Sequence, residues 1–167
     1  MDLESLHFIV KLLLILSLLY LAYIDWRTFR LPDHVTLPLI CIGIVFNAVS
    51  ELGFTNTSSA LIGGILGYGF LWALNSGFRA IKGRNGIGMG DAKLLAALGA
   101  WLGWVALPNI LFFASFLGLI GGLAWLKFNK QKLNRAFPFG PFLAIAGIIE
   151  LLWPQFIQNL LPTFFPN

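Results

Sequence analysis

Apolar residues fill most of this chain, and they come in runs of about 20 residues separated by short polar stretches. At a rise of about 1.5 Å per residue, a helix of about 20 residues covers the hydrocarbon core of a bilayer, which is roughly 30 Å thick. The pattern therefore predicts an all-α protein, a polytopic transmembrane helical bundle in contact with a lipid bilayer.

We expect about six spans in a single domain that covers residues 1–167. In the last of them, Pro154 predicts a kink. The first run could be mistaken for a signal peptide, but it is long enough to span, its flank is acidic and no small-residue cleavage site follows it. The expected spans are residues 6–25, 35–52, 58–80, 92–106, 109–128 and 140–161.

The composition agrees with a membrane protein, because 58% of the residues are hydrophobic and only 11% are charged. This balance excludes a soluble globular domain and a disordered chain. Small residues recur at four-residue spacing, which lets helices pack closely in lipid. These pairs are Gly63 and Gly67, Gly99 and Gly103, and Gly118 and Gly122.

The basic residues predict the orientation in the membrane. They gather in the first, third and fifth loops between the expected spans, and cytoplasmic loops are rich in Lys and Arg. We therefore expect both termini on the outer side, as an even number of spans requires. The charges lie in short loops without an aromatic platform, so no nucleic-acid partner is expected. The loop residues are Arg27, Arg30, Arg79, Lys82, Arg84, Lys127, Lys130, Lys132 and Arg135, with Lys93 just beyond the third loop.

Three acids fall at the cytoplasmic boundary, namely Asp25, Asp33 and Asp91. A carboxylate in a membrane is costly, by about 2.5–3.5 kcal/mol at the centre of a helix on insertion scales. Glu150, in the sixth expected span, is interpreted as a buried partner for a hydroxyl or amide, or as a group that reaches the outer water. Three further acids, Asp2, Glu4 and Glu51, lie at outer ends or loops and need no special role.

Helix capping explains some of these acids better than others. Asp33 follows Pro32 and could cap the second span by accepting from the backbone, and Asp91 could cap the fourth span in the same way. Asp91, however, follows Gly86, Gly88 and Gly90, and a cap does not need three glycines before it. Glycines let another chain approach closely, so we interpret Gly88 and Gly90 as room for an extended ligand.

Asp25 closes the first span, at a helix C-terminus where the macrodipole disfavours negative charge. Pairing with Arg27 and Arg30 is one explanation, and a functional acid is the other. Two carboxyls brought close together share one proton, so Asp25 and Asp91 could act as an acid and base pair. Such a pair cleaves a peptide bond without a metal. Cys41 is the only cysteine, so the sequence offers neither a CxxC metal site nor any other cofactor site.

Four blocks of sequence, in order, resemble the prepilin peptidases, or type IV leader peptidases, of the GxGD aspartyl protease class. They are Ile24-Asp25-Trp26-Arg27-Thr28-Phe29-Arg30-Leu31-Pro32-Asp33, the stretch from Gly88-Met89-Gly90-Asp91 to Trp104, residues 118–122, and Pro138-Phe139-Gly140-Pro141-Phe142-Leu143-Ala144.

The resemblance implies a bacterial inner-membrane, multi-pass endopeptidase that cleaves the leader of type IV prepilins or pseudopilins. It implies a catalytic pair at Asp25 and Asp91, with Asp33 matching a family acid that is not usually assigned catalysis. We expect Gly88, Gly90, Asp33 and Lys93 to bind substrate or support the site. The oligomeric state is left open.

One family feature is missing, and one alternative function competes. Longer bacterial members carry a cytoplasmic segment with two cysteine pairs and also methylate the new N-terminus, whereas Cys41 is alone here. The sequence therefore gives no support for N-methyltransferase activity. The alternative is a small proton- or ion-coupled transporter whose boundary acids and Lys93 carry protons or bind a cation.

Overall fold

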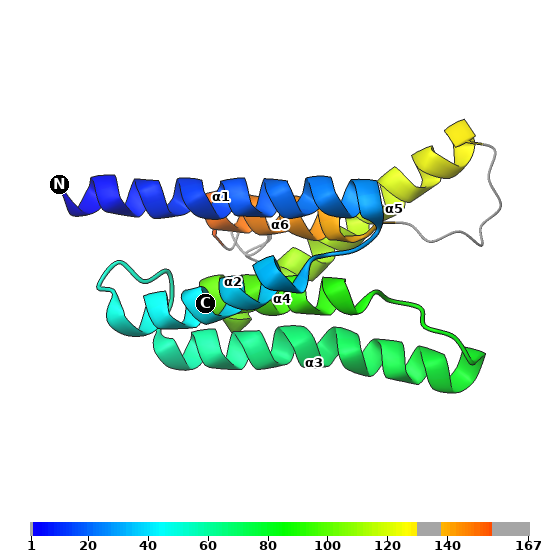
Figure 1. Ribbon diagram of the computed structural model, residues 1–167, viewed down its shortest axis with the longest axis horizontal. Helices are drawn as coiled ribbons and strands as arrows, with labels where there is room; N and C mark the ends of the chain where they lie inside the picture. Colours follow the sequence, from blue (N-terminus) through cyan, green and yellow to red (C-terminus); the bar gives the residue numbers. More distant parts are fainter. Residues whose placement is uncertain (1, 130–137, 155–167) are drawn as a thin grey trace, which may run out of the picture.

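The structure is a computed structural model that describes residues 2–129 and 138–154, and every regular element in those residues is a helix. This confirms the all-α prediction. Consecutive helices run alternately in opposite directions, and α1 lies beside α6 (Figure 1). The elements are α1 (Leu3–Thr28), α2 (Asp33–Val49), α3 (Thr57–Lys82), α4 (Met89–Leu102), the 3-10 helix η1 (Trp104–Ala106), α5 (Leu107–Asn129) and α6 (Gly140–Leu152).

Three helical segments of the described chain are long and apolar enough to cross a membrane: Leu3–Thr28, Thr57–Lys82 and Trp104–Leu123. Their outer faces expose large apolar side chains, such as Phe8 at 68% and Ile65 at 71%, as helices that face lipid do. The helices α2 and α6 are shorter, and the 14 residues of α4 extend only about 21 Å. Helix length thus supports a membrane protein with three long spans, and the expected count of six is not reproduced by length alone.

Two of the expected spans end differently in the structure. The run expected over 92–106 breaks at Gly103, whose φ is +85°. A Cβ at this position would lie 2.5 Å from the Ser59 hydroxyl oxygen, so the site has no room for a side chain. The last helix stops at Leu152, so the predicted kink at Pro154 is wrong, since the helix does not continue to it. Residues 155–161 of that expected span lie outside the described residues.

Helix α4 forms the centre of the bundle, because nearly all its side chains are buried and it packs against α2, α3, α5 and α6. Its closest neighbour is α3. A Cβ at Gly63 would collide with the Gly99 backbone, and one at Gly67 would lie 2.6 Å from the Leu95 carbonyl oxygen. The prediction that small residues bring helices together is therefore confirmed for Gly63, Gly67 and Gly99, which hold α3 against α4.

Buried polar side chains tie the far end of α4 to its neighbours. The Asn47 amide of α2 donates to the Ala100 carbonyl at 2.9 Å and to the Trp101 carbonyl at 3.0 Å. The Trp101 indole N–H donates to the Leu39 carbonyl at 2.9 Å. Glu150, on α6, has an amide partner, as the sequence suggested, because Asn109 Nδ2 lies 3.3 Å and 3.4 Å from its two carboxylate oxygens. The carboxylate is thus satisfied inside the bundle.

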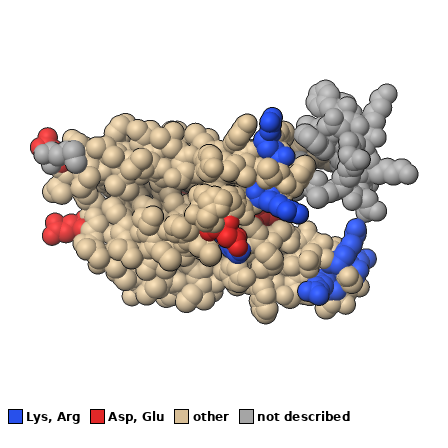
Figure 2. All heavy atoms as spheres, in the orientation of Figure 1, with Lys and Arg blue, Asp and Glu red and all other residues tan. Residues whose placement is uncertain are grey.

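Charged side chains separate between the two ends of the molecule. Lys and Arg gather where α1 and α3 end, with Arg27, Arg79 and Lys82 in the last turns, whereas acids mark the end where α1 begins (Figure 2). The predicted basic residues Lys130, Lys132 and Arg135 lie outside the described residues. The basic end is also the end at which α4 begins, so it carries the predicted functional acids.

Candidate active site

A cavity of about 490 Å³ opens at the basic end of the bundle, where α1 ends and α2, α4 and α6 begin. The structure brings Asp25 and Asp91 together in its wall, although they come from two different helices. The cavity is lined by Asp25, Phe29, Arg30, Leu31, Asp33, Asn85, Gly86, Ile87, Gly88, Met89, Gly90, Asp91, Pro138 and Phe139. Five of the six predicted site residues lie in this lining, and the sixth, Lys93, binds one of them.

Asp91 is the third residue of α4 and is 9% exposed. The helix begins after Gly88, whose carbonyl accepts from the Asp91 backbone N–H at 3.1 Å. The Asp91 carboxyl in turn accepts a hydrogen bond from the Gly88 backbone, which is the return half of a capping box. The N-cap is therefore Gly88 and not Asp91, so the capping explanation considered for Asp91 does not hold, yet its carboxyl still lies in the first turn, where the helix macrodipole favours negative charge.

Asp25 lies in the last full turn of α1 and is 5% exposed. The helix is capped by Phe29, whose φ is +54° and whose N–H donates to the Asp25 carbonyl at 2.8 Å. The Asp25 carboxylate accepts from the backbone N–H of Gly140 at 3.1 Å. Gly140 is the first residue of α6. The N-terminus of α6 therefore favours the negative charge on Asp25, which the C-terminus of α1 disfavours. Asp25 thus has a hydrogen bond from Gly140 where the sequence had suggested pairing with Arg27 and Arg30.

Gly140 is a site residue whose role sequence reasoning missed. A Cβ built on Gly140 would lie 2.7 Å from Asp25 Oδ2 and 3.0 Å from its carboxyl carbon, so only glycine leaves room for the carboxylate in its present position. The signal was present in the stretch Pro138-Phe139-Gly140-Pro141, where a proline directly after a glycine marks the start of a helix. Its contact with Asp25 crosses more than 100 residues of sequence and could not be read from that signal.

The carboxyls of Asp25 and Asp91 are near enough to interact electrostatically. Both are largely withdrawn from water, and two like charges in such surroundings resist ionising together. A pair that holds one proton between its members can take a proton at one carboxylate while donating a hydrogen bond from the other. The arrangement is therefore suited to acid and base catalysis on a ligand in the cavity.

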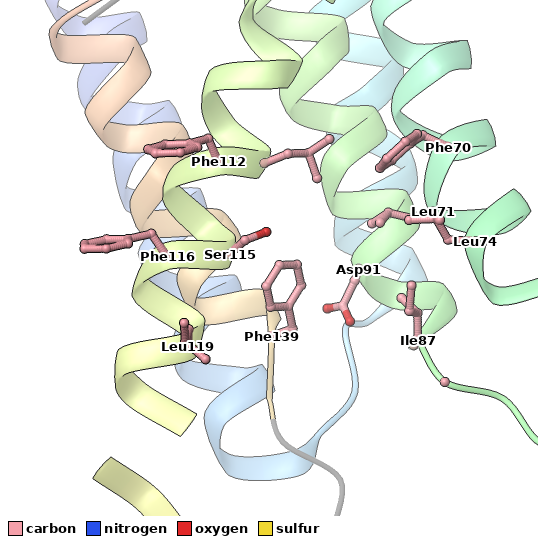
Figure 3. A pocket seen from close by; sticks show the side chains of 13 residues that line it. Phe70, Leu71, Leu74, Ile87, Asp91, Phe112, Ser115, Phe116, Leu119 and Phe139 are labelled. Atoms are coloured by element: carbon pink, nitrogen blue, oxygen red, sulfur yellow. The ribbon is translucent and has the colours of Figure 1, made fainter. Parts of the chain in front are cut away.

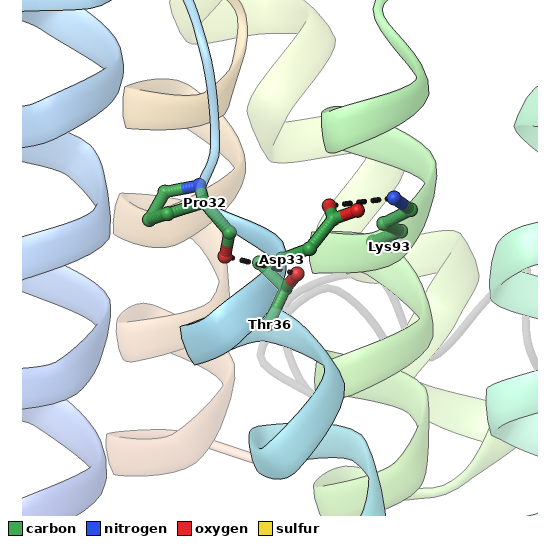
Figure 4. A network of polar contacts seen from close by, with 4 residues as sticks. All are labelled: Pro32, Asp33, Thr36 and Lys93. Carbon is green, nitrogen blue, oxygen red and sulfur yellow. Dashed lines mark hydrogen bonds and ion pairs between the residues drawn. The ribbon is translucent and has the colours of Figure 1, made fainter.

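Asp33 does not cap α2, in contrast to the prediction. It is the first residue of the helix, and the Val35 and Thr36 N–H groups donate to the Pro32 carbonyl instead. Its carboxylate is turned away and accepts from Lys93 Nζ at 2.6 Å (Figure 4). The Asp33 side chain is 59% exposed and that of Lys93 is 22% exposed. This ion pair joins the start of α2 to the first turns of α4, at the edge of the cavity.

The two predicted glycines differ in what they accommodate. A Cβ at Gly90 would lie 2.9 Å from Leu31 Cβ, so Gly90 gives room to the connection between α1 and α2 of the chain itself. A Cβ at Gly88 would meet only Asp91, with Oδ2 at 3.2 Å. The open face of Gly88 is therefore available to a ligand in the cavity, whereas the corresponding face of Gly90 is taken by Leu31.

A second, larger cavity of about 820 Å³ meets the first at Asp91. Its walls come from α3 and α5 and are mostly apolar, with Phe139 facing Asp91 across it and Ile87 beside Asp91 (Figure 3). The two cavities share the lining residues Gly86, Ile87, Gly88, Asp91 and Phe139. The remaining residues of the larger cavity are Phe70, Leu71, Leu74, Leu111, Phe112, Ser115, Phe116 and Leu119.

In the part of the chain that the structure describes, no group of three or more His, Cys, Asp and Glu side chains lies close enough together to hold a metal ion. Cys41 is exposed on α2, away from the cavity lining. The polar and charged side chains that line the smaller cavity are Asp25, Arg30, Asp33, Asn85 and Asp91.

Comparison with known proteins gives a family match over most of the chain. The family model described as the type IV leader peptidase family matches residues 12–123. That range contains Asp25, Asp33 and Asp91. No solved structure matches the chain. The family match gives no support to the alternative prediction of a transporter.

Curated relatives carry the name prepilin leader peptidase/N-methyltransferase. The relative from Aeromonas hydrophila is 43% identical over 157 residues, which are 94% of this chain and 53% of that protein. The relative from Aeromonas salmonicida (strain A449) is 45% identical over 151 residues, or 90% of this chain and 51% of that protein. The relative from Dickeya chrysanthemi is 45% identical over 132 residues, or 79% and 46%. The chain thus spans about half the length of the curated relatives it matches.

Proposed function

The chain belongs to the type IV leader peptidase family, and we propose that it is a membrane aspartic endopeptidase that cleaves the leader peptide of type IV prepilins or pseudopilins. The observation that carries the proposal is the meeting of two buried carboxyls, Asp25 and Asp91, in the wall of one cavity. The names of the relatives support the choice of prepilin leaders as substrates.

In the proposed reaction the two aspartates share one proton. The ionised carboxylate takes a proton from water, and the water oxygen forms a bond to the scissile carbonyl carbon. The protonated carboxyl gives its proton to the carbonyl oxygen, so that a neutral tetrahedral intermediate forms. When the intermediate collapses, the C–N bond breaks, the carboxyl that was protonated in the first step gives its proton to the leaving amine, and one hydroxyl of the intermediate returns a proton to the other carboxylate, so that the pair again holds one proton. General acid and base catalysis of this kind contributes about 10²–10⁴-fold in rate.

The two cavities suggest how a substrate chain lies across the dyad. The smaller cavity has charged and amide groups at its edge, including Arg30, Asp33 and Asn85, and suits a polar leader. The larger cavity is lined mostly by apolar side chains and suits the apolar segment that follows the scissile bond. Asp91 and the open face of Gly88 lie where the two cavities meet, so the scissile bond is placed there.

The same proposal includes the topology that the charges predict. The basic end, with Arg27, Arg79 and Lys82, faces the cytoplasm, and both termini lie on the outer side of the bacterial inner membrane. The shorter helices α2, α4 and α6 then complete about six spans, with part of their length in the interfacial region. N-methyltransferase activity is not included, because the chain matches only about half of each relative that bears that name.

The test is cleavage of a purified prepilin by membranes that contain the chain. Wild-type membranes are expected to release the leader at one peptide bond, as identified by mass spectrometry of both products. The double variant Asp25→Ala/Asp91→Ala, present in the membrane at the same level, is expected to release none. The proposal is overturned if wild-type membranes leave the prepilin intact, or if the double variant yields the same products.

A further inference from the structure

The loop that forms the shared wall of the two cavities is held from behind by one side chain of α3. Asn75 Oδ1 accepts from the backbone N–H of Gly86 at 2.9 Å and from that of Ile87 at 3.1 Å. Its amide nitrogen lies 3.4 Å from Asn85 Oδ1 and 3.8 Å from the Met89 sulfur. Asn75 is itself buried, with 6% of its surface exposed. One amide side chain thus contacts the loop at both ends.

The loop has no regular secondary structure of its own. After α3 ends at Lys82 with the left-handed Gly83 as its cap, the chain runs without regular structure to the start of α4 at Met89. Gly86 packs on Phe78, since a Cβ there would lie 2.6 Å from the ring. Glycines leave such a backbone free to adopt many conformations, so the two hydrogen bonds from Gly86 and Ile87 to Asn75 restrict the conformation that the wall adopts.

From this geometry we infer that Asn75 is a positioning residue for the reaction, and that it acts by clamping the Gly86 and Ile87 backbone against which the substrate chain lies. The inference rests on the proposed function. Gly86, Ile87 and Gly88 line both cavities, and Asp91 follows them within one helical turn. A shift of the loop therefore displaces the substrate and the Asp91 carboxyl relative to each other. A misplacement of about 1 Å can cost about 100-fold in rate.

Two substitutions separate the acceptor from the rest of the side chain. Asn75→Ala removes the oxygen that binds both N–H groups, and kcat for prepilin cleavage is expected to fall by about 10-fold to 100-fold, with a smaller change in KM. Asn75→Asp keeps an acceptor oxygen for the two N–H groups but places a second oxygen against Asn85 Oδ1, so kcat is expected to recover only part of the loss seen in Asn75→Ala. Asn75→Ser, whose shorter hydroxyl does not reach both N–H groups, replaces Asn75→Ala if that variant fails to accumulate.

The matched control is Asn47, a buried asparagine of α2 that also clamps backbone, at the far end of α4. Asn47→Ala is expected to lower the unfolding temperature at least as much as Asn75→Ala while leaving kcat per folded molecule unchanged. Hydrogen exchange provides a readout without substrate, because the amides of Gly86 and Ile87 should exchange at least 10-fold faster in Asn75→Ala than in wild type or Asn47→Ala.

The outcomes distinguish this inference from the proposed function. Absence of cleavage by the wild-type chain overturns the proposed function, and the catalytic part of the inference with it. Cleavage by the wild type together with an unchanged kcat in Asn75→Ala overturns the inference alone. An equal loss of kcat in Asn47→Ala also overturns it, since the effect is then one of general stability. Unchanged exchange at Gly86 and Ile87 overturns it as well, since Asn75 then does not hold the loop.

Discussion

The surroundings of Asp25 and Asp91 differ in how much of the chain is needed to build them. Asp91 takes its hydrogen bond from Gly88, within its own helical turn. Asp25 takes its hydrogen bond from Gly140, at the start of a helix more than 100 residues later. One carboxyl is positioned by local structure, whereas the other depends on the docking of α6 against α1.

This difference indicates where the distance between the two carboxyls is set. Helix α4 is fixed to α3 by glycine contacts, and nearly all of its residues are buried, so Asp91 belongs to the most buried part of the bundle. Asp25 belongs to the pair formed by α1 and α6. The distance between Asp25 and Asp91 therefore depends on how the pair of α1 and α6 packs against the other helices.

The largest effect is expected when either carboxyl is removed, because the proposed reaction needs both members of the pair. Asp25→Ala and Asp91→Ala are each expected to lower kcat/KM for prepilin cleavage by at least about 10²–10⁴-fold, measured by densitometry of the processed product. Glu150→Gln is the control, because Glu150 is a buried acid of α6 that lines neither of the two cavities. Near-normal cleavage by either alanine variant would show that the dyad is wrongly assigned.

The second prediction breaks the comparison by disturbing only the tertiary contact. Gly140→Ala is expected to push the Asp25 carboxylate aside, since the new Cβ would lie 2.7 Å from Oδ2, and to lower kcat by about 10-fold to 100-fold. Gly88→Ala should lower kcat less, because its Cβ would lie 3.2 Å from Asp91 Oδ2, and the methyl group in the proposed substrate space should act mainly by raising KM. Steady-state kinetics of the two variants test this order, and a larger loss of kcat in Gly88→Ala would reverse the interpretation of the two surroundings.

A third prediction concerns the anchoring of the helix that carries Asp91. Gly63→Ala places a methyl group against the Gly99 backbone, which cannot yield as a side chain can, and we expect a loss of about 1–3 kcal/mol in the free energy of unfolding. Gly69→Ala, on the same helix, is the control, since its Cβ would meet no atom within 4 Å. Thermal unfolding of the two variants in detergent tests this, and equal unfolding temperatures would contradict the packing account.

The smallest expected effect is at the ion pair of Asp33 and Lys93. The pair is partly exposed, so its loss should cost about 1 kcal/mol or less in unfolding free energy. Asp33→Asn and Lys93→Met are each expected to retain cleavage within about threefold of wild type. The double variant should cost no more than either single one if the pair acts as a unit. A loss comparable with that of Asp25→Ala would instead make Asp33 part of the catalytic machinery.

The helical runs and the glycine contacts of α3 and α4 could be predicted from the sequence because apolar length and small-residue spacing are local patterns. The breaks at Gly103 and Leu152 could not. Gly103 ends α4 because its backbone has a positive φ and crowds against Ser59, and that neighbour is brought there only by the fold. The number of full spans is likewise set by how deeply the short helices α2, α4 and α6 are embedded, which composition does not reveal.

The candidate site divides in the same way. The pairing of Asp25 with Asp91 could be proposed from helix ends and charge, because both fall at one boundary. The cap expected of Asp33 was wrong, since Lys93 lies within 2.6 Å of its carboxylate and draws it away from the backbone. Gly140 and Asn75 were missed because each acts through contacts with residues that are distant in the sequence or lie in an irregular loop.

The contact of Gly63 with Gly99 has a consequence for how a substrate reaches the dyad. Where two helices touch backbone to backbone, neither a lipid chain nor a peptide can pass between them. The larger cavity is instead bordered by α3 on one side and α5 on the other, with Phe70 and Phe116 in its wall. For the proposed reaction we therefore expect an apolar substrate segment to reach the two aspartates between α3 and α5, and a crosslink joining those two helices to stop cleavage.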